Sequence, residues 1–186
     1  MSKSGYTTQN SLLLSNLLDW YKQDNNLNKM LKIINGESTI SLRIVDWFAT
    51  NYAKKHFTVY NIERDNNIER FIVYADYKLK LKAYSKKRFD PFCRWDRITI
   101  PYKTGERIQT TLGQLNFFKW AIENKVIDYI GNNYKEIEQD MNFRNSTTQK
   151  KEHIETNKTR KKREELSVSA SKSIKKENVV VVLKFN

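Results

Sequence analysis

The stretch TTLGQLNFFKWAIENKVIDYI, residues 110–130, has the pattern of two helices separated by a short break. Thr110 or Thr111 can cap a helix over 112–124, because a threonine oxygen accepts a backbone N–H that the first helical turn leaves unpaired. An Asn-Lys pair ends that helix, and a second helix begins at Val126. The apolar side chains of the pair predict a packed core rather than a helix-turn-helix DNA reader, since the second helix offers few basic residues for base edges.

Three helices are predicted upstream, because apolar residues recur at intervals of three and four over 11–24, 27–34 and 40–55. From Phe57 onward, two β-rich runs flank a polar turn, which predicts a hairpin. Over 77–89 the continuing alternation predicts a strand, and a helix that begins near its first residue is the alternative.

The whole pattern predicts an α+β fold with a helical N-terminal subregion, a small antiparallel sheet that includes 97–102, C-terminal helices and a flexible basic tail. We expect 1–145 to form a single domain, because a chain of 186 residues is short for two cores. Residues 146–178 lack apolar periodicity and are expected to form the flexible tail. The strand-like tip VVVVLKFN, 179–186, could pair with this protein's own sheet or with another protein.

The chain is strongly basic, with 34 Lys and Arg against 21 Asp and Glu and a formal charge of +13. This balance favours nucleic acid, an anionic membrane surface or an acidic protein as the partner. A single cysteine and two histidines exclude an intrachain disulfide and the usual zinc quartets, and no glycine-rich phosphate loop is present. No apolar run is long enough for a membrane span. We therefore expect a non-enzymatic protein without cofactor, bound metal or membrane-spanning segment.

The candidate site is the segment KLKLKAYSKKRFDPFCRWDR at 78–97, in which positive side chains alternate with aromatic rings. If its first part is a strand, lysines project from one face about 7 Å apart, which suits contacts with phosphates. The rings could stack on exposed bases or could attach the loop to the core. The residues predicted to bind nucleic acid are Lys78, Lys80, Lys82, Tyr84, Lys86, Lys87, Arg88, Arg94, Trp95 and Arg97.

Other interpretations of the polar residues stay open. The lysines could instead form a solvated face above an aromatic core, or could meet an acidic protein. Carboxylates such as Glu63, Asp65 and Glu69 could hold a divalent metal in a nuclease, although ion pairing with nearby arginines explains them adequately. Cys93 beside Arg94 is expected to be a packed thiol rather than a reactive one.

Three stretches are distinctive as strings: SLRIVDWFATNYAKKH at 41–56, YKLKLKAYSKKRFDPFCR at 77–94 and QTTLGQLNFFKWAIENKVIDYI at 109–130. Together they resemble a conserved, uncharacterised family of giant double-stranded DNA viruses, the mimivirus-like and related lineages. The resemblance carries no catalytic residue. It implies a viral protein that is made in an infected host.

These observations predict a viral protein that binds nucleic acid, DNA in the first place, mainly through phosphates. Its expected setting is genome packaging, the virion core or viral gene expression. The alternative is a virion structural or protein-interaction module that docks partners through the basic segment and residues 179–186. The expected location is the virion and the viral factory in the host cytoplasm. The nucleus is a further expectation, because KTRKKREE at 158–165 resembles an import signal.

Overall fold

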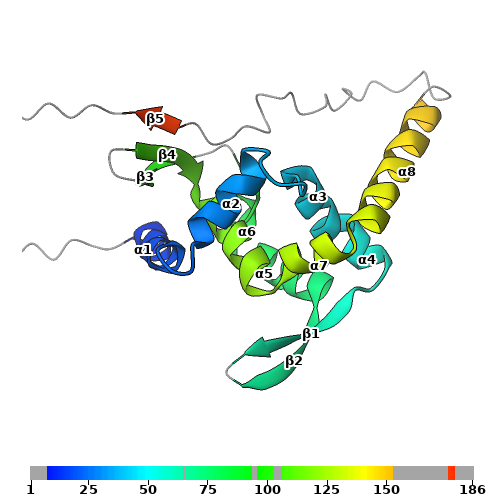
Figure 1. Ribbon diagram of the computed structural model, residues 1–186, viewed down its shortest axis with the longest axis horizontal. Helices are drawn as coiled ribbons and strands as arrows, with labels where there is room; N and C mark the ends of the chain where they lie inside the picture. Colours follow the sequence, from blue (N-terminus) through cyan, green and yellow to red (C-terminus); the bar gives the residue numbers. More distant parts are fainter. Residues whose placement is uncertain (1–7, 65, 94–95, 103–105, 153–175, 179–186) are drawn as a thin grey trace, which may run out of the picture.

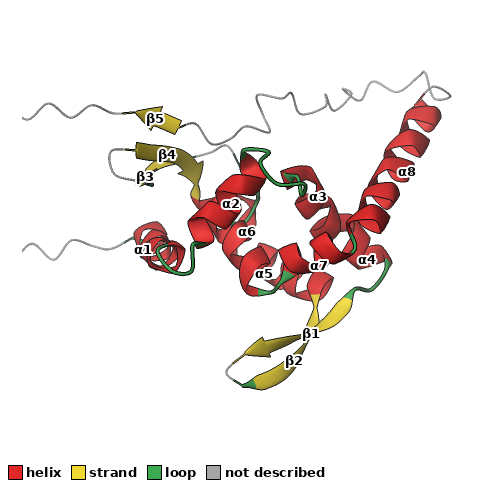
Figure 2. Ribbon diagram, viewed as in Figure 1, coloured by secondary structure: helices red, strands yellow, loops and turns green. Residues whose placement is uncertain are grey.

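Helices build the body of the molecule, and two small antiparallel sheets are attached to it (Figure 1, Figure 2). The structure is a computed structural model that describes residues 8–64, 66–93, 96–102, 106–152 and 176–178. The arrangement confirms the predicted α+β class. The N-terminal helical subregion consists of α1 (Gln9–Tyr21), α2 (Asn26–Ile34), α3 (Leu42–Trp47), the π-helical turn η1 (Phe48–Tyr52) and α4 (Ala53–Lys55).

Helix α6 (Leu112–Glu123) lies at the centre of the helical body. It contacts α1, α2, α5 (Val73–Arg88), α7 (Val126–Asn132) and β4 (Glu106–Thr111). Every residue from Leu112 to Phe118 is buried, and the hydroxyl of Tyr21 in α1 donates a hydrogen bond to the carbonyl of Leu115 at 2.7 Å. Thr111 caps the helix, as its oxygen accepts the backbone N–H of Gln114. The packed-core interpretation of this helix is therefore confirmed.

Helix α5 occupies the segment for which the sequence allowed either a strand or a helix, so the strand prediction is wrong. Val73, Tyr77 and Leu81 repeat every four residues, a spacing that satisfies both an alternating and a helical pattern. In the helix they form one stripe that packs into or against the core. The carboxylate of Asp76 accepts a hydrogen bond from the indole Nε1–H of Trp120 at 2.6 Å, which joins α5 to α6.

The loop that follows α5 is attached to the first turns of α6. The side-chain amide of Asn116 donates to the carbonyl of Arg88 at 2.9 Å, and that of Gln114 donates to the carbonyl of Pro91 at 3.2 Å. Phe89 is 1% exposed and packs among the core aromatic rings. Phe89 therefore attaches the loop to the core, which is the second of the two roles predicted for the aromatic residues of 78–97.

Gly113 permits the close approach between α6 and this loop. A Cβ atom added there would lie 3.0 Å from Cβ of Cys93 and 3.1 Å from the carbonyl oxygen of Lys87. We expect Gly113→Ala to lower the free energy of unfolding by about 1–2 kcal/mol, because the added methyl overpacks a fixed contact.

The matched control is Gly131→Ala in α7, where the nearest atom would be 3.9 Å away. That substitution should raise the free energy of unfolding by about 0.5–1 kcal/mol, since alanine favours the helix. Urea titrations of both variants check the pair. Equal effects of the two substitutions would contradict a close contact at Gly113.

Two sheets complete the fold. Strands β1 (Val59–Arg64) and β2 (Asn67–Ile72) form the predicted hairpin, which projects from the helical body (Figure 1). In the second sheet, β3 (Arg97–Pro101), β4 and β5 (Lys176–Asn178) follow one another in antiparallel order, and neither β4 nor β5 is among the predicted strands. Helix α8 (Tyr134–Glu152) continues past residue 145. Two segments that the sequence assigned to the tail therefore have regular backbone structure.

Candidate nucleic-acid interface

The lysines of α5 lie on two different flanks of the helix. Lys78 and Lys82 are four residues apart, so they are exposed neighbours on one flank about 6 Å apart along the axis. Lys80 lies about 200° around the helix from Lys78 and is half-buried. The expectation that a strand presents all three lysines on one face is therefore wrong.

The first flank gathers basic side chains from two helices around one aromatic ring. The Nζ atoms of Lys54 in α4 and of Lys78 both lie 5.7 Å from the ring centroid of Tyr74. Lys82 continues the flank by one turn. Lys54, Tyr74, Lys78 and Lys82 are called the lysine flank below. None of its three lysines forms an ion pair with a carboxylate in the part of the chain that the structure describes.

Beyond the lysine flank, α5 is interrupted at Ser85, which has φ 60° and ψ 167°. Lys86 follows this break and interacts electrostatically with Asp46 and Asp90. The pKa of Asp46 is raised to about 6, mainly by burial and also by neighbouring Asp90, while Lys86 opposes the shift. Burial likewise raises the pKa of Asp90. The charge of Lys86 is thus partly offset by nearby carboxyl groups.

The remaining predicted residues serve local contacts or lie elsewhere. Lys87 pairs with Asp96 at 3.1 Å, and Arg88 donates to the side-chain oxygen of Gln9 at 2.9 Å. Arg97 is the exposed first residue of β3. Arg94 and Trp95 lie outside the described residues. The described members of the predicted set therefore do not form one continuous surface.

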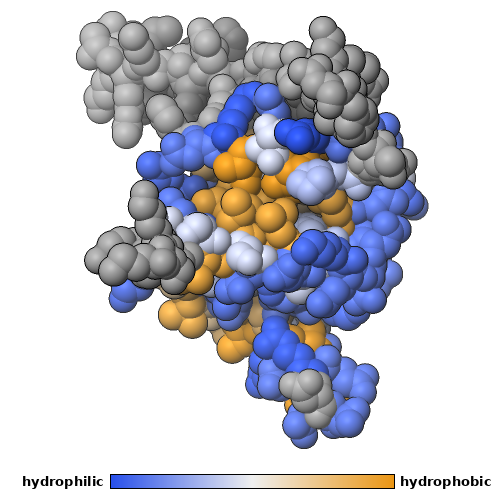
Figure 3. All heavy atoms as spheres, turned by 90° about the vertical axis from the view of Figure 1, so that its left-hand side faces the viewer, coloured by the Kyte–Doolittle hydropathy of each residue, from blue (hydrophilic) through white to orange (hydrophobic). Residues whose placement is uncertain are grey.

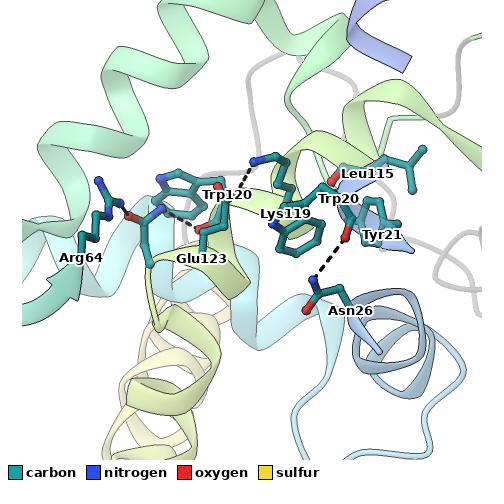
Figure 4. Close-up of polar contacts among 9 residues, drawn as sticks. Trp20, Tyr21, Asn26, Arg64, Leu115, Lys119, Trp120 and Glu123 are labelled. Atoms are coloured by element: carbon teal, nitrogen blue, oxygen red, sulfur yellow. Dashed lines mark hydrogen bonds and ion pairs between the residues drawn. The ribbon is translucent and has the colours of Figure 1, made fainter. Parts of the chain in front are cut away.

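The opposite flank of α5 faces a partly open cleft of about 660 Å³ between α1, α5 and α6. Lys80 and Tyr84 line it from α5, and Lys119 and Trp120 line it from α6. Figure 4 shows Lys119 near Glu123, its ion-pair partner, and near Trp20, whose ring centroid is 5.2 Å from the Lys119 Nζ. The cleft thus combines cations with aromatic rings.

At the other end of the cleft, Arg64 of β1 donates to the side-chain oxygen of Asn124 (Figure 4). Asn124 in turn donates to the carbonyl of Trp120 at 2.7 Å, and its own carbonyl accepts the hydroxyl of Tyr60 at 2.7 Å. Arg64 also lies 3.6 Å from a carboxylate oxygen of Glu69. Glu69 therefore forms an ion pair with Arg64, in agreement with the interpretation that nearby arginines pair with these carboxylates.

Sequence reasoning missed four residues that these two sites use: Lys54 and Tyr74 on the lysine flank, and Arg64 and Lys119 in the cleft. The sequence marks these residues only weakly. Lys54 belongs to a basic pair at 54–55, and Arg64 and Lys119 are single cations in other elements. Lys54, Arg64 and Lys119 come from α4, β1 and α6 and approach α5 only through tertiary packing, so residue spacing could not group them. Tyr74 lies four residues before Lys78 in α5, so only a helical interpretation of this segment would have placed it there.

A third polar cluster fixes α8 to the helices before it. Asp140 accepts hydrogen bonds from Lys55 and from the indole Nε1–H of Trp47, the latter at 3.1 Å. Burial raises the pKa of Asp140, but these hydrogen bonds outweigh the effect and hold it below its usual value. The cluster stabilises helix packing.

Among the described residues no group of three or more His, Cys, Asp and Glu is arranged to hold a metal ion, and Asp65 lies outside them. Cys93 is buried, and its thiol lies 3.5 Å from the carbonyl of Lys87, in agreement with a packed thiol. No described helix has both the length and the apolar character needed to cross a bilayer.

Figure 3 views the molecule from the side of α1 and the second sheet. Apolar residues gather in the middle of this face, with hydrophilic residues around them. Leu12 of α1 is 54% exposed. Nearby, β5 pairs with β4 in the register Glu106 opposite Asn178. The predicted tip, 179–186, follows β5 directly and lies outside the described residues.

The fold and its two sites define a small α+β protein with a helical core, a basic flank and a polar aromatic cleft. A family model described as a family of unknown function, DUF7197, matches residues 3–186. The chain belongs to this family.

A relative of this chain comes from a giant virus. An uncharacterized protein of Acanthamoeba polyphaga mimivirus is 50% identical to this chain over 117 residues. The match covers 60% of this chain and 45% of the relative, so it spans less than half the length of that protein. No solved structure matches. The resemblance to an uncharacterised giant-virus family is thus confirmed.

Proposed function

We propose that this protein binds nucleic acid, DNA in the first place, through phosphate contacts at the lysine flank. The observation that carries the proposal is the convergence of Lys54 and Lys78, from two helices, on the ring of Tyr74. The formal charge of +13 adds a long-range attraction for a polyanion.

The chemistry of the lysine flank favours phosphates over base edges. Its lysines lack carboxylate partners among the described residues, so a phosphate can replace bound counterions there without breaking an ion pair. A lysine ammonium is a point charge without the bidentate geometry that reads a base pair. The half-buried ring of Tyr74 offers a stacking surface beside them. Binding is therefore expected to show little sequence preference.

The test measures binding of duplex DNA, single-stranded DNA and RNA by fluorescence anisotropy at several salt concentrations. Replacing Lys54, Lys78 and Lys82 together by Ala should reduce the log–log salt slope for duplex DNA by about 3, because three phosphate contacts are lost. The matched control replaces Lys29, Lys32 and Lys135, three exposed lysines of α2 and α8, by Ala.

The control carries the same change in net charge and should keep most of the wild-type slope. If both triple variants bind alike, the attraction comes from net charge and the lysine flank is not the site. If the wild-type protein binds none of the three nucleic acids at low salt, the proposed function is wrong.

A further inference from the structure

The cleft on the other flank of α5 has the volume of a small-molecule site. Its volume of about 660 Å³ is in the usual range for such sites, and it is lined by residues from three helices and one strand. It is separated from the lysine flank by the body of α5. The proposed nucleic-acid function does not use it.

The charges of the cleft favour an anion. Arg64, Lys80 and Lys119 supply three cations against the carboxylates of Asp76 and Glu123. Glu123 pairs with Lys119, Arg64 also pairs with Glu69 outside the cleft lining, and Asp76 accepts the indole N–H of Trp120. Lys80 forms no ion pair with a described residue, so its ammonium is available to a ligand.

Helices α5 and α6 run antiparallel along the cleft, with most of its charged groups near one end and Tyr84 near the other. Asp76 bonds Trp120 near one end, and Asn116 bonds the carbonyl of Arg88 near the other. Arg64 approaches at the first end through Asn124 (Figure 4). The opposite end holds the half-buried ring of Tyr84, which stacks with Phe89 at a centroid distance of 6.3 Å. Asn16 and Asn116 add amide groups to the lining, and Leu13 and Leu17 add apolar ones.

We propose that this cleft binds a nucleoside 5′-phosphate. Lys80 and Arg64 receive the phosphate, the ring of Tyr84 stacks on the base, and Asn16 offers a polar contact to the base or ribose. Lys80 lies between the two ends, one helical turn from Tyr84, which suits a ligand with an anionic group joined to a planar ring. The same chemistry fits a free nucleotide and the phosphorylated end of a strand.

The experiment titrates the full chain with AMP, CMP, GMP and UMP by isothermal calorimetry. Adenosine, inorganic phosphate and a short 5′-phosphorylated oligonucleotide are titrated in parallel. Lys80→Ala should weaken binding of the nucleoside phosphate at least tenfold, and Tyr84→Leu at least fivefold. The matched control is Lys32→Ala, an exposed lysine of α2 that belongs to neither the cleft nor the lysine flank. It should change the Kd less than twofold.

Each outcome bears on the proposal. Binding of AMP, or of the phosphorylated oligonucleotide alone, with the expected loss in Lys80→Ala supports it and identifies the source of the ligand. Equal weakening by Lys80→Ala and Lys32→Ala, or no binding by any nucleoside phosphate, overturns it. If inorganic phosphate binds as tightly as AMP, the nucleoside contributes nothing to binding, and the proposal of a nucleoside ligand is wrong. Urea titrations of the variants establish that they are folded.

The result is independent of the proposed function. The triple substitution at Lys54, Lys78 and Lys82 should leave nucleoside phosphate binding unchanged while it flattens the salt dependence of DNA binding. Loss of one activity without the other therefore shows which proposal fails.

Discussion

Phe117→Ala is expected to lower the free energy of unfolding by about 3–5 kcal/mol, because it opens a cavity at the centre of the core. The side chain is fully buried and lies against the rings of Tyr77, Phe89 and Trp120. These neighbours come from α5, from the loop after it and from α6 itself, so several elements would have to shift together to fill the space. A urea titration measures the change as a lower transition midpoint.

The matched control is Phe57→Ala, the same chemical change at a residue that is 68% exposed. It should alter the free energy of unfolding by less than about 0.5 kcal/mol, since exposed side chains contribute little packing. Comparable losses in the two variants would contradict the central position of α6.

Asp46→Asn is expected to stabilise the protein above neutral pH. Burial is the main cause that raises the pKa of Asp46 to about 6, with Asp90 adding to the shift and Lys86 opposing it. Its carboxylate accepts no hydrogen bond from a described residue, so only the charge of Lys86 offsets part of the cost of ionisation. The substitution should raise the free energy of unfolding at pH 7.5 by about 2 kcal/mol, because it removes the cost of an ionised buried group.

The direction of the pH dependence follows from the raised pKa. The unfolded chain releases the Asp46 proton near pH 4, whereas the folded protein retains it until about pH 6. The wild-type protein therefore loses stability as the pH rises from about 4 to above 6, and the loss approaches about 3 kcal/mol for a shift of this size. The variant should lose less than the wild type over that range and match it more closely at pH 4.

The control for this prediction is Asp19→Asn, a mostly exposed carboxylate that pairs with Lys22 on the surface of α1. Its effect on the free energy of unfolding should stay below about 1 kcal/mol, since exposed ion pairs contribute little. Unfolding free energies measured at intervals from pH 4 to 8 separate the two variants. A parallel pH profile for wild type and Asp46→Asn would contradict the burial of Asp46.

The sequence predicted local structure well where a residue pattern was compatible with only one kind of secondary structure. Thr111 caps α6, and 27–34 is helical, because capping chemistry and helical spacing act within a few residues. The segment 77–89 was ambiguous because residues four apart satisfy a period of two as well as a helical period. In the structure the segment is a helix that packs against α6, and the hydrogen bond between Asp76 and Trp120 is one of the contacts between them. The spacing of residues within the segment could not predict contacts with α6.

By itself the sequence determined the α+β class, the hairpin after Phe57, the apolar helix at the centre of the core and the strong positive charge. Each of these depends on composition or on neighbours along the chain. Only the tertiary structure decided that the lysines of α5 divide between two flanks, that Lys54 joins one of them and that Arg64 joins the cleft on the other. The reason is physical: a helix turns successive side chains by about 100°, and only the packing of other elements fixes which residues meet on each side.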